Sequence, residues 1–420
     1  MANAVDAPKD SFRLSMLIYD TRYRSLTIQV IVLMLFMAGA AWLVDNTVRN
    51  LAVLGKDFNF GFLGQRAGYD IAQRLIPYTN ADTHARALLV GLLNTLLIAV
   101  LGCFAATVIG VIVGVLRLSS NWLVARLMTV YVEMFRNVPL LLWILLVFTA
   151  FTEASPLPAT FRVNAQTGEA ESSMLFGLFA VTNRYTAIPD VLVERGLGSL
   201  ALGPLSINLT FLAIVAVIAG SLLARRALLR HATAVQEATG LRPKTWWKSL
   251  LILILPIAAL LWALGVHLSV PAITGFNFTG GVNVSNSFMA LWLALSLYTS
   301  AFIAEIVRAG ILAVSRGQTE AAFALGLRPR RTMSLVILPQ ALRVIVPPLI
   351  SQYLNLTKNS SLAIAVGYLD LRGTLGGITL NQTGRELECV LLMMLIYLAI
   401  SLVISGAMNV YNARIKLKER

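Results

Sequence analysis

Two pairs of oppositely charged residues interrupt long runs of apolar residues. Glu133 and Arg136 lie in one run, and Glu305 and Arg308 lie in another, with the same spacing in each pair. A helix places residues with this spacing on one face, where the two charges can interact. Charged side chains within a membrane are costly, which makes them candidates for function. Glu305 and Arg308 could form an inner gate or contact a substrate, and Glu133 and Arg136 could bind a zwitterion. Simple ion pairing, within a helix or between helices, is the alternative for both pairs.

No group of residues predicts covalent chemistry or a bound metal. The two cysteines, Cys103 and Cys389, fall inside apolar runs, and the three histidines are far apart in the sequence. This pattern indicates neither a disulfide framework nor a metal site. The sequence also has no G-x-x-x-x-G-K-[ST] motif, which would cradle nucleotide phosphates. We therefore expect a non-catalytic chain without a cofactor of its own, and any ATP would have to bind to another subunit.

The composition predicts an integral membrane protein. The 420 residues are 57% hydrophobic and only 13% charged, with a mean hydropathy of +0.76, whereas soluble domains contain about 25% charged residues. In a soluble protein, the net charge of +14 would suggest nucleic acid. In a membrane protein, basic residues hold loops on the cytoplasmic side and contact lipid headgroups. We therefore expect lipid, and no nucleic acid, as a partner.

Eight stretches are long and apolar enough to cross a bilayer, which requires about 20 residues. They are residues 26–44, 87–116, 131–148, 205–224, 249–267, 288–312, 341–358 and 387–410. The first stretch follows a polar lead too long for a signal peptide, which favours an uncleaved anchor. The polar segments 153–204 and 269–287 are expected to be loops, and 359–386 a partly re-entrant segment at the outer mouth.

The distribution of basic residues predicts the orientation of the chain. With the N-terminus in the cytoplasm, 21 of the 34 Lys and Arg residues fall in cytoplasmic segments and 10 in outer segments. Cytoplasmic loops of membrane proteins carry such an excess. We therefore expect both termini in the cytoplasm, together with the segment that follows the sixth span.

The segment after the sixth span changes abruptly from apolar to polar. It contains Glu320-Ala321-Ala322, then Gly326, and it ends at Leu338-Pro339. We expect a short helix with Thr319 as its N-cap and Glu320 in its first turn, where a carboxylate is stabilising. The alanines allow close approach, and Gly326 can end the helix in a left-handed turn. Such a helix could dock in a groove of a partner, and an ordinary amphipathic loop is the alternative.

Five motifs occur in order along the chain. They are Gly91…Thr95, Glu133-x-x-Arg136-x-x-Pro139, Tyr298-x-Ser300-Ala301 with Ala304-Glu305-x-x-Arg308-x-Gly310, the segment from Glu320 to Gly326, and Lys358-Asn359-Ser360-Ser361-Leu362. Together they resemble the membrane subunits of ABC transporters in the polar amino-acid uptake family, the histidine/glutamine permease type. The resemblance implies an all-α, type I importer core in which Glu320, Ala321, Ala322 and Gly326 belong to the EAA loop that couples to an ATPase. It also implies that Thr95, Lys358 and Asn359, with the two charged pairs, are candidates for the substrate path or gate.

The chain is longer than the five-span core of that family. The additional spans make it similar to the longer, Q-type membrane subunits of general L-amino-acid transporters. The expected organisation has an N-terminal tail, an extra span and an outer loop at 1–86, and the first part of the core at 87–152. An insertion with two extra spans follows at 153–286, and the second part of the core at 287–420.

The resemblance implies a permease of the bacterial inner membrane that imports L-amino acids. Its expected partners are ATP-binding subunits, a second permease subunit that is identical or homologous, and a periplasmic or extracellular amino-acid-binding protein. A secondary transporter or channel driven by an ion gradient is the alternative. Secondary transporters usually contain an internal repeat, and none is clear in this sequence.

Overall fold

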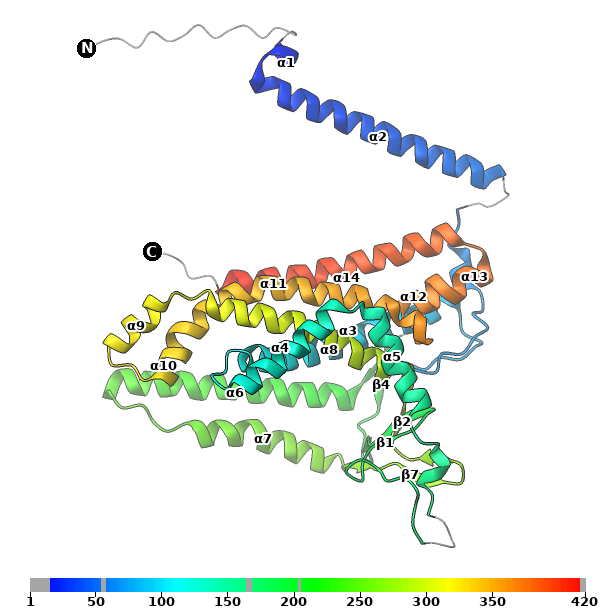
Figure 1. Ribbon diagram of the computed structural model, residues 1–420. Coiled ribbons are helices and arrows are strands. Elements are labelled where there is room, and N and C mark those ends of the chain that lie inside the picture. Colours follow the sequence, from blue (N-terminus) through cyan, green and yellow to red (C-terminus); the bar gives the residue numbers. More distant parts are fainter. Residues whose placement is uncertain (1–15, 54–57, 164–167, 203–204, 416–420) are drawn as a thin grey trace, which may run out of the picture.

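Long helices lying side by side dominate the computed structural model, which describes residues 16–53, 58–163, 168–202 and 205–415 (Figure 1). Seven helices among these residues are long and apolar enough to cross a membrane. They are α2 (Thr21–Val53), α3 (His84–Leu116), α6 (Leu209–Thr239), α7 (Trp246–Ala263), α8 (Asn286–Leu312), α11 (Leu338–Asn359) and α14 (Glu386–Ile415). A four-residue helix, α1 (Met16–Tyr19), precedes α2. The predicted helical membrane protein is confirmed.

The third predicted span, 131–148, is two helices rather than one straight helix. The helix α4 (Trp122–Asn137) and the helix α5 (Leu140–Glu153) meet at a bend of 106°. Val138 between them is extended, with φ −107° and ψ 133°, because the proline that follows disfavours the helical conformation. Pro139 itself has no N–H to continue the helix. Counting the bent pair as one span gives the predicted total of eight.

The polar segments 153–204 and 269–287, expected to be loops, contain short antiparallel strands. One sheet has the order β1-β2-β9, and three two-stranded sheets pair β3 with β6, β4 with β5 and β7 with β8. The strands are β1 (Ala180–Val181), β2 (Tyr185–Ile188), β3 (Asp190–Val193), β4 (Ser199–Leu202), β5 (Leu205–Asn208), β6 (Val266–Ser269), β7 (Ala272–Thr274), β8 (Asn277–Thr279) and β9 (Val282–Ser285). Tyr185 pairs with Ser285, so this lobe closes through residues that are distant in sequence.

The helix array has two distinct ends (Figure 1). One, which we call the α9 end, carries α9 (Arg316–Ala324), α10 (Pro329–Thr332) and the π-helical turn η3 (Met333–Ile337). The other, the strand end, carries the strands together with several short helices. These are η1 (Gly61–Gly64), η2 (Pro158–Phe161), η4 (Ser360–Val366), α12 (Leu371–Gly373), η5 (Thr374–Thr379) and α13 (Leu380–Thr383).

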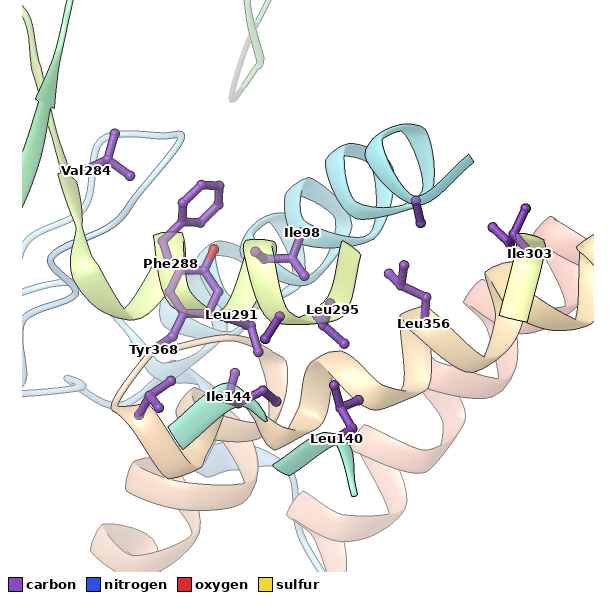
Figure 2. Close-up of a cluster of buried hydrophobic side chains, with 14 of the residues drawn as sticks. Ile98, Leu140, Ile144, Val284, Phe288, Leu291, Leu295, Ile303, Leu356 and Tyr368 are labelled. Atoms are coloured by element: carbon purple, nitrogen blue, oxygen red, sulfur yellow. The ribbon is translucent and has the colours of Figure 1, made fainter. Parts of the chain in front are cut away.

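The core forms where α3 and α8 approach each other closely. A Cβ atom on Gly110 would lie 2.7 Å from Cβ of Ile303 and 2.9 Å from the backbone oxygen of Ser300, so only glycine fits there. Such close approach is typical of small residues between membrane helices. Buried apolar side chains extend this contact, as Figure 2 shows, with Ile98, Leu291 and Leu295 among those that are fully enclosed. This packing fixes α8, the helix that leads directly toward α9.

Two parts of the array are less enclosed than this core. The helices α6 and α7, which contain the fourth and fifth predicted spans, pack mainly on each other. The helix α6 continues to Thr239, well past the predicted end of its span at residue 224, and Gly240 ends it with φ +71°. The helix α2 stands apart from the other helices in Figure 1, and none of its described side chains is buried.

Candidate functional site

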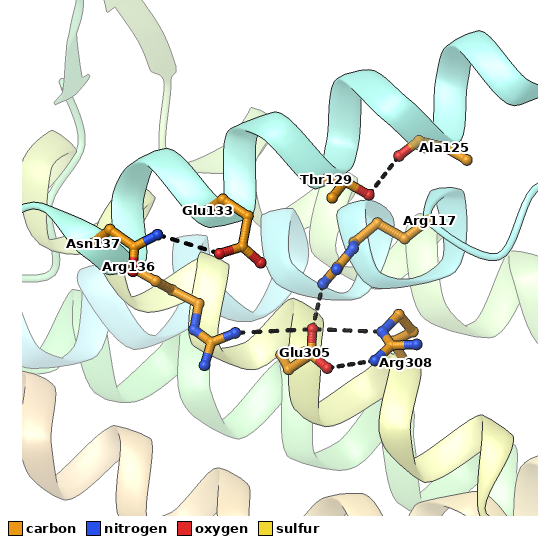
Figure 3. A network of polar contacts seen from close by, with 8 residues as sticks. All are labelled: Arg117, Ala125, Thr129, Glu133, Arg136, Asn137, Glu305 and Arg308. Carbon is orange, nitrogen blue, oxygen red and sulfur yellow. Dashed lines mark hydrogen bonds and ion pairs between the residues drawn. The ribbon is translucent and has the colours of Figure 1, made fainter.

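Glu305 is the centre of a charged cluster formed by three helices (Figure 3). Its Oε1 accepts a hydrogen bond from Nη2 of Arg308 at 2.6 Å. Its Oε2 accepts a hydrogen bond from Nη1 of Arg117 and lies 4.0 Å from Nη1 of Arg136. One carboxylate therefore faces three guanidinium groups, which we call the Glu305 cluster.

Local structure explains how these side chains meet. Glu305 and Arg308 lie one turn apart on α8, and Arg117 is the residue that caps the C-terminus of α3. Arg136 lies in the last turn of α4, directly before the break at Pro139. Its guanidinium carbon is 5.4 Å from the ring centroid of Phe302 on α8, within the range of a cation–π contact. The break in the third span therefore directs Arg136 toward α8.

The Glu305 cluster has an excess of positive charge and is partly enclosed. The side chain of Arg117 is only 9% exposed, whereas those of Glu305, Arg308 and Arg136 are 27%, 33% and 35% exposed. The Nε atom of Arg117 is buried and has no hydrogen-bond partner. Charges buried in this way need compensation. The arrangement can hold helices together through one carboxylate, and its surplus positive charge can attract a second carboxylate.

The structure confirms one of the two predicted pairs and corrects the other. Glu305 and Arg308 form the expected ion pair. Glu133 and Arg136 do not pair with each other, since Oε2 of Glu133 accepts a hydrogen bond from the Asn137 amide at 3.2 Å and Arg136 turns toward Glu305. Sequence spacing could not show this, because Arg136 and Asn137 both lie within about one turn of Glu133 on α4. The contact of Arg136 with Glu305 joins two different helices.

Arg117 is the member of the Glu305 cluster that sequence reasoning missed. It is not one of the spaced charged pairs, although it directly follows the apolar stretch 87–116. The depth of the two residues in the membrane could have indicated this contact, because Arg117 ends its span at the same membrane face toward which Glu305 lies. A glutamate inside a span and an arginine at the end of a neighbouring span can meet at that depth, but only the packing of α3 on α8 selects this pair.

The other three candidate residues lie at the strand end, away from the Glu305 cluster. Thr95 is fully buried, where its hydroxyl donates to the Gly91 carbonyl at 3.0 Å and accepts from the Leu371 N–H at 3.0 Å. The second contact holds α12 against α3. Lys358 and Asn359 form the last turn of α11, with Lys358 exposed and Asn359 half-buried.

The second candidate site is the exposed helix α9 and the turn after it. The helix begins after Ser315 rather than after Thr319, so Glu320 lies exposed in the middle of the helix and not in its first turn. Ala322 is buried on one side of α9. The side chains of Phe323 and Leu325 are 47% and 82% exposed, and the segment that follows them is rich in arginine.

Gly326 ends α9 as predicted. Its φ is +75°, in the left-handed region, and nothing surrounds the position where a Cβ would be. The Gly326 N–H donates to the Phe323 carbonyl at 2.9 Å, and the Leu327 N–H donates to the Ala322 carbonyl at 3.1 Å. These bonds satisfy carbonyls at the helix end and reverse the chain into α10. The result is a rigid helix–turn–helix with exposed apolar side chains.

The part of the chain that the structure describes contains no candidate metal site. His, Cys, Asp and Glu side chains do not gather there in groups of three. The two cysteines are also separate free thiols, with Cys389 buried and Cys103 half-buried.

Comparisons with known proteins agree with this picture. The family model described as binding-protein-dependent transport system inner membrane component matches residues 106–417. A glutamate/glutamine/aspartate/asparagine transport system permease protein of Rhodobacter capsulatus is 66% identical, and the alignment covers 100% of both chains. A general L-amino acid transport system permease protein of Rhizobium johnstonii is 43% identical over 98% of this chain and 96% of its own. A probable glutamine ABC transporter permease protein of Bacillus subtilis is 35% identical, over 49% of this chain and 90% of its own.

Proposed function

The chain belongs to the family of binding-protein-dependent transport system inner membrane components, and we propose that it moves L-amino acids through the membrane in an ATP-driven importer. The amino acids are delivered by a solute-binding protein. The full-length similarity of this chain to a glutamate/glutamine/aspartate/asparagine permease and to a general L-amino acid permease supports this substrate class. The surplus positive charge of the Glu305 cluster suits substrates with two carboxylates. The binding protein selects among them before they reach this chain.

The α9 end faces the cytoplasm and carries the contact with the ATPase. The excess of basic residues in the segments assigned to this side supports that orientation, which places both chain termini in the cytoplasm. Phe323 and Leu325 offer exposed apolar contacts, and a short helix of this kind fits a groove in a partner protein. The ATPase subunits bind and hydrolyse the ATP, and this chain needs no cofactor. Glu320, Ala321, Ala322 and Gly326 form the coupling element.

The importer also contains a second permease subunit, identical or homologous to this one. The strand end faces the periplasm and receives the binding protein. Thr95 there holds the mouth in shape, and Lys358 and Asn359 line it. The chain in this assembly is a transport component of the inner membrane and does no covalent chemistry.

The Glu305 cluster acts as the gate at the cytoplasmic side. It joins α3, α4 and α8 at the α9 end of the array. The helix α8 ends at Leu312 and α9 begins at Arg316, so only a short connection separates the cluster from the coupling element. A rigid displacement of α9 by the ATPase is therefore transmitted directly to α8. Separation of Glu305 from Arg117 or Arg136 would open the path.

The left-handed turn at Gly326 is the observation that carries this proposal, and Gly326→Ala tests it. A side chain in this conformation costs roughly 1–2 kcal/mol, so the turn should reorient α9. We expect the variant to insert normally, to lose most ATP-dependent uptake of labelled glutamate, and to co-purify poorly with the ATPase. Gly317→Ala is the matched control, because Gly317 lies within α9 in open space without a left-handed φ.

Two further experiments complete this test. Glu320→Lys reverses the charge at an exposed position of α9, and it should also weaken co-purification without affecting insertion. Uptake should stop when ATP is depleted and should continue when ion gradients are collapsed. Normal uptake and normal ATPase association in Gly326→Ala, or uptake driven by an ion gradient alone, would overturn the proposal.

A further inference from the structure

An apolar groove runs between α3, α11 and α14 in the middle of the helix array. Its volume is 580 Å³, and it is lined by Leu92, Leu96, Ala99, Val100, Cys103, Tyr353, Thr357, Ile396, Ala399, Ile400, Val403 and Ile404. The Tyr353 hydroxyl is engaged with that of Thr107 at 2.7 Å, which leaves an aliphatic surface. Side chains at its rim, such as Val100 and Val403, are 66% and 70% exposed. The groove therefore needs an apolar occupant.

The strand end of this groove is already covered by the chain segment that follows α2. Phe62 is buried in a cluster that also includes Leu88 and Leu92 of α3, and Leu392 and Ile396 of α14. Leu92 and Ile396 also line the groove. The covered surface and the open groove are therefore one continuous surface, and the chain that covers it leads back toward α2.

The helix α2 is tethered at the mouth of this groove, and none of its described side chains is buried. Four residues separate Val53, the end of α2, from Phe58, and the five Cα–Cα steps between them reach at most about 17 Å. The N–H of Asn59 donates to Oε1 of Glu388 at 3.1 Å, at the start of α14. The apolar part of α2 has no buried residue. A helix held so close to a complementary surface has a high effective concentration there.

Counting residues from both ends gives one register for α2 along the groove. Cys103 lies 14 residues before Arg117 on α3, and Ala38 lies 14 residues after Arg24 on α2, or roughly 21 Å in each helix. Matching Ala38 with Cys103 places Val53 level with Leu88, which belongs to the same cluster as Phe62. The two ends therefore agree. At the depth of the groove, α2 presents the run Ala38-Gly39-Ala40-Ala41, and small residues allow helices to approach closely.

We propose that α2 lies along the groove between α3, α11 and α14 in the membrane, antiparallel to α14, with Ala38–Ala41 at the level of Cys103. The docked helix covers the groove within the same chain. It continues the contact that Phe62 begins, and it stabilises the strand end of α14. The extra N-terminal span is thus an integral part of the permease rather than a loose anchor.

Crosslinking to Cys103 tests this arrangement, because the sequence has only one other cysteine. In a Cys389→Ala background, single cysteines replace Met37, Ala38, Gly39 and Ala40 in turn, which covers one helical turn. A protease site placed at residues 54–57 separates α2 from the rest after crosslinking. The assembled transporter in its native membrane is oxidised with copper phenanthroline, cleaved, and analysed without reductant. Leu33→Cys, one to two turns nearer the N-terminus than these positions, is the depth control.

We expect one or two adjacent positions of the turn to crosslink in most of the chains, so that α2 stays attached to the remainder until reductant is added. The opposite face of the turn and the depth control should crosslink little, since disulfides require Cα atoms closer than about 7 Å. Uptake by each uncrosslinked variant should equal that of the background protein.

Three outcomes would overturn the proposal. Equal, weak crosslinking at all four positions would mean that α2 moves freely and that lipid chains fill the groove. A crosslink that joins two chains would assign the groove to α2 of a neighbouring subunit. No crosslink at any position, with α2 inserted and the introduced thiols reactive toward a maleimide in detergent, would place α2 elsewhere. None of these outcomes depends on whether the importer is driven by ATP.

Discussion

The change Glu305→Gln isolates the contribution of the Glu305 cluster to the structure. It removes the negative charge that two guanidinium groups contact through hydrogen bonds and that Arg136 faces at 4.0 Å. Each hydrogen bond to a charged group contributes about 1.5–3 kcal/mol, and removing one partner of a buried pair costs about 3–5 kcal/mol. Glutamine keeps one acceptor, and the Glu305 side chain is 27% exposed. We therefore expect a loss of about 2–3 kcal/mol in the free energy of unfolding.

The largest part of that loss should come from Arg117, whose side chain is only 9% exposed and whose Nε is already unpaired. The double change Glu305→Gln with Arg117→Gln removes the stranded charge, so it should cost less than the sum of the two single changes. Their difference, the coupling energy of a contacting pair, should fall in the range of about 0.5–3 kcal/mol. This measurement separates the ion pair from general packing effects.

The assay is unfolding of the purified chain in mixed micelles by increasing fractions of dodecyl sulfate, followed by fluorescence of its 7 tryptophans. Glu133→Gln is the matched control, because it is the same substitution on an exposed glutamate that contacts only the Asn137 amide in the described chain. That control should stay within about 0.5 kcal/mol of the parent. A Glu305→Gln effect no larger than the control, or additivity in the double variant, would refute the buried-cluster reasoning.

Two other predictions concern packing and pH. Gly110→Ala should destabilise the chain by about 1–3 kcal/mol, because its Cβ would meet Ile303 at 2.7 Å. Gly220→Ala on α6, in open space, should instead stabilise it by up to about 1 kcal/mol. Equal effects of the two changes in the unfolding assay would contradict the close contact of α3 with α8. Asp370, in the segment between η4 and α14, is fully buried, and burial raises its pKa from 3.8 to about 6. Since its ionised form is disfavoured in the folded chain, its contribution to stability is fully present below pH 3.8 and is lost as the pH rises through about 6. Thermal unfolding of the transporter between pH 4 and 7 should therefore show a smaller loss of stability for Asp370→Asn than for the parent, and identical profiles would show that Asp370 does not titrate in this range.

Local chemistry explains which features could be predicted from the sequence. Apolar length alone determines which segments can cross a membrane, and the predicted number of spans agrees with the structure. The turn at Gly326 was predictable because glycine adopts φ +75° at a helix end without the steric cost that a Cβ brings. The pairing of Glu305 with Arg308 was predictable because helix geometry fixes neighbours on the same turn.

Features that depend on distant residues were not accessible in the same way. The start of α9 at Arg316 rather than after Thr319 reflects a choice between several possible caps that local preference does not decide. The β1-β2-β9 sheet requires Tyr185 and Ser285 to meet, and strands of two to four residues carry too little alternation to predict such pairing.

The sequence by itself determined that this chain is a membrane permease and that a short helix after the sixth span ends at Gly326, because hydropathy, residue spacing and glycine at a turn act over a few residues at a time. Only the tertiary structure decided which charges meet. Pro139 breaks the third span and turns Arg136 away from Glu133, and the approach of α3 to α8 at Gly110 brings Arg117 to Glu305. The reason is physical: an ion pair forms between the side chains that packing brings within about 4 Å, and packing between helices is settled by contacts far apart in the chain.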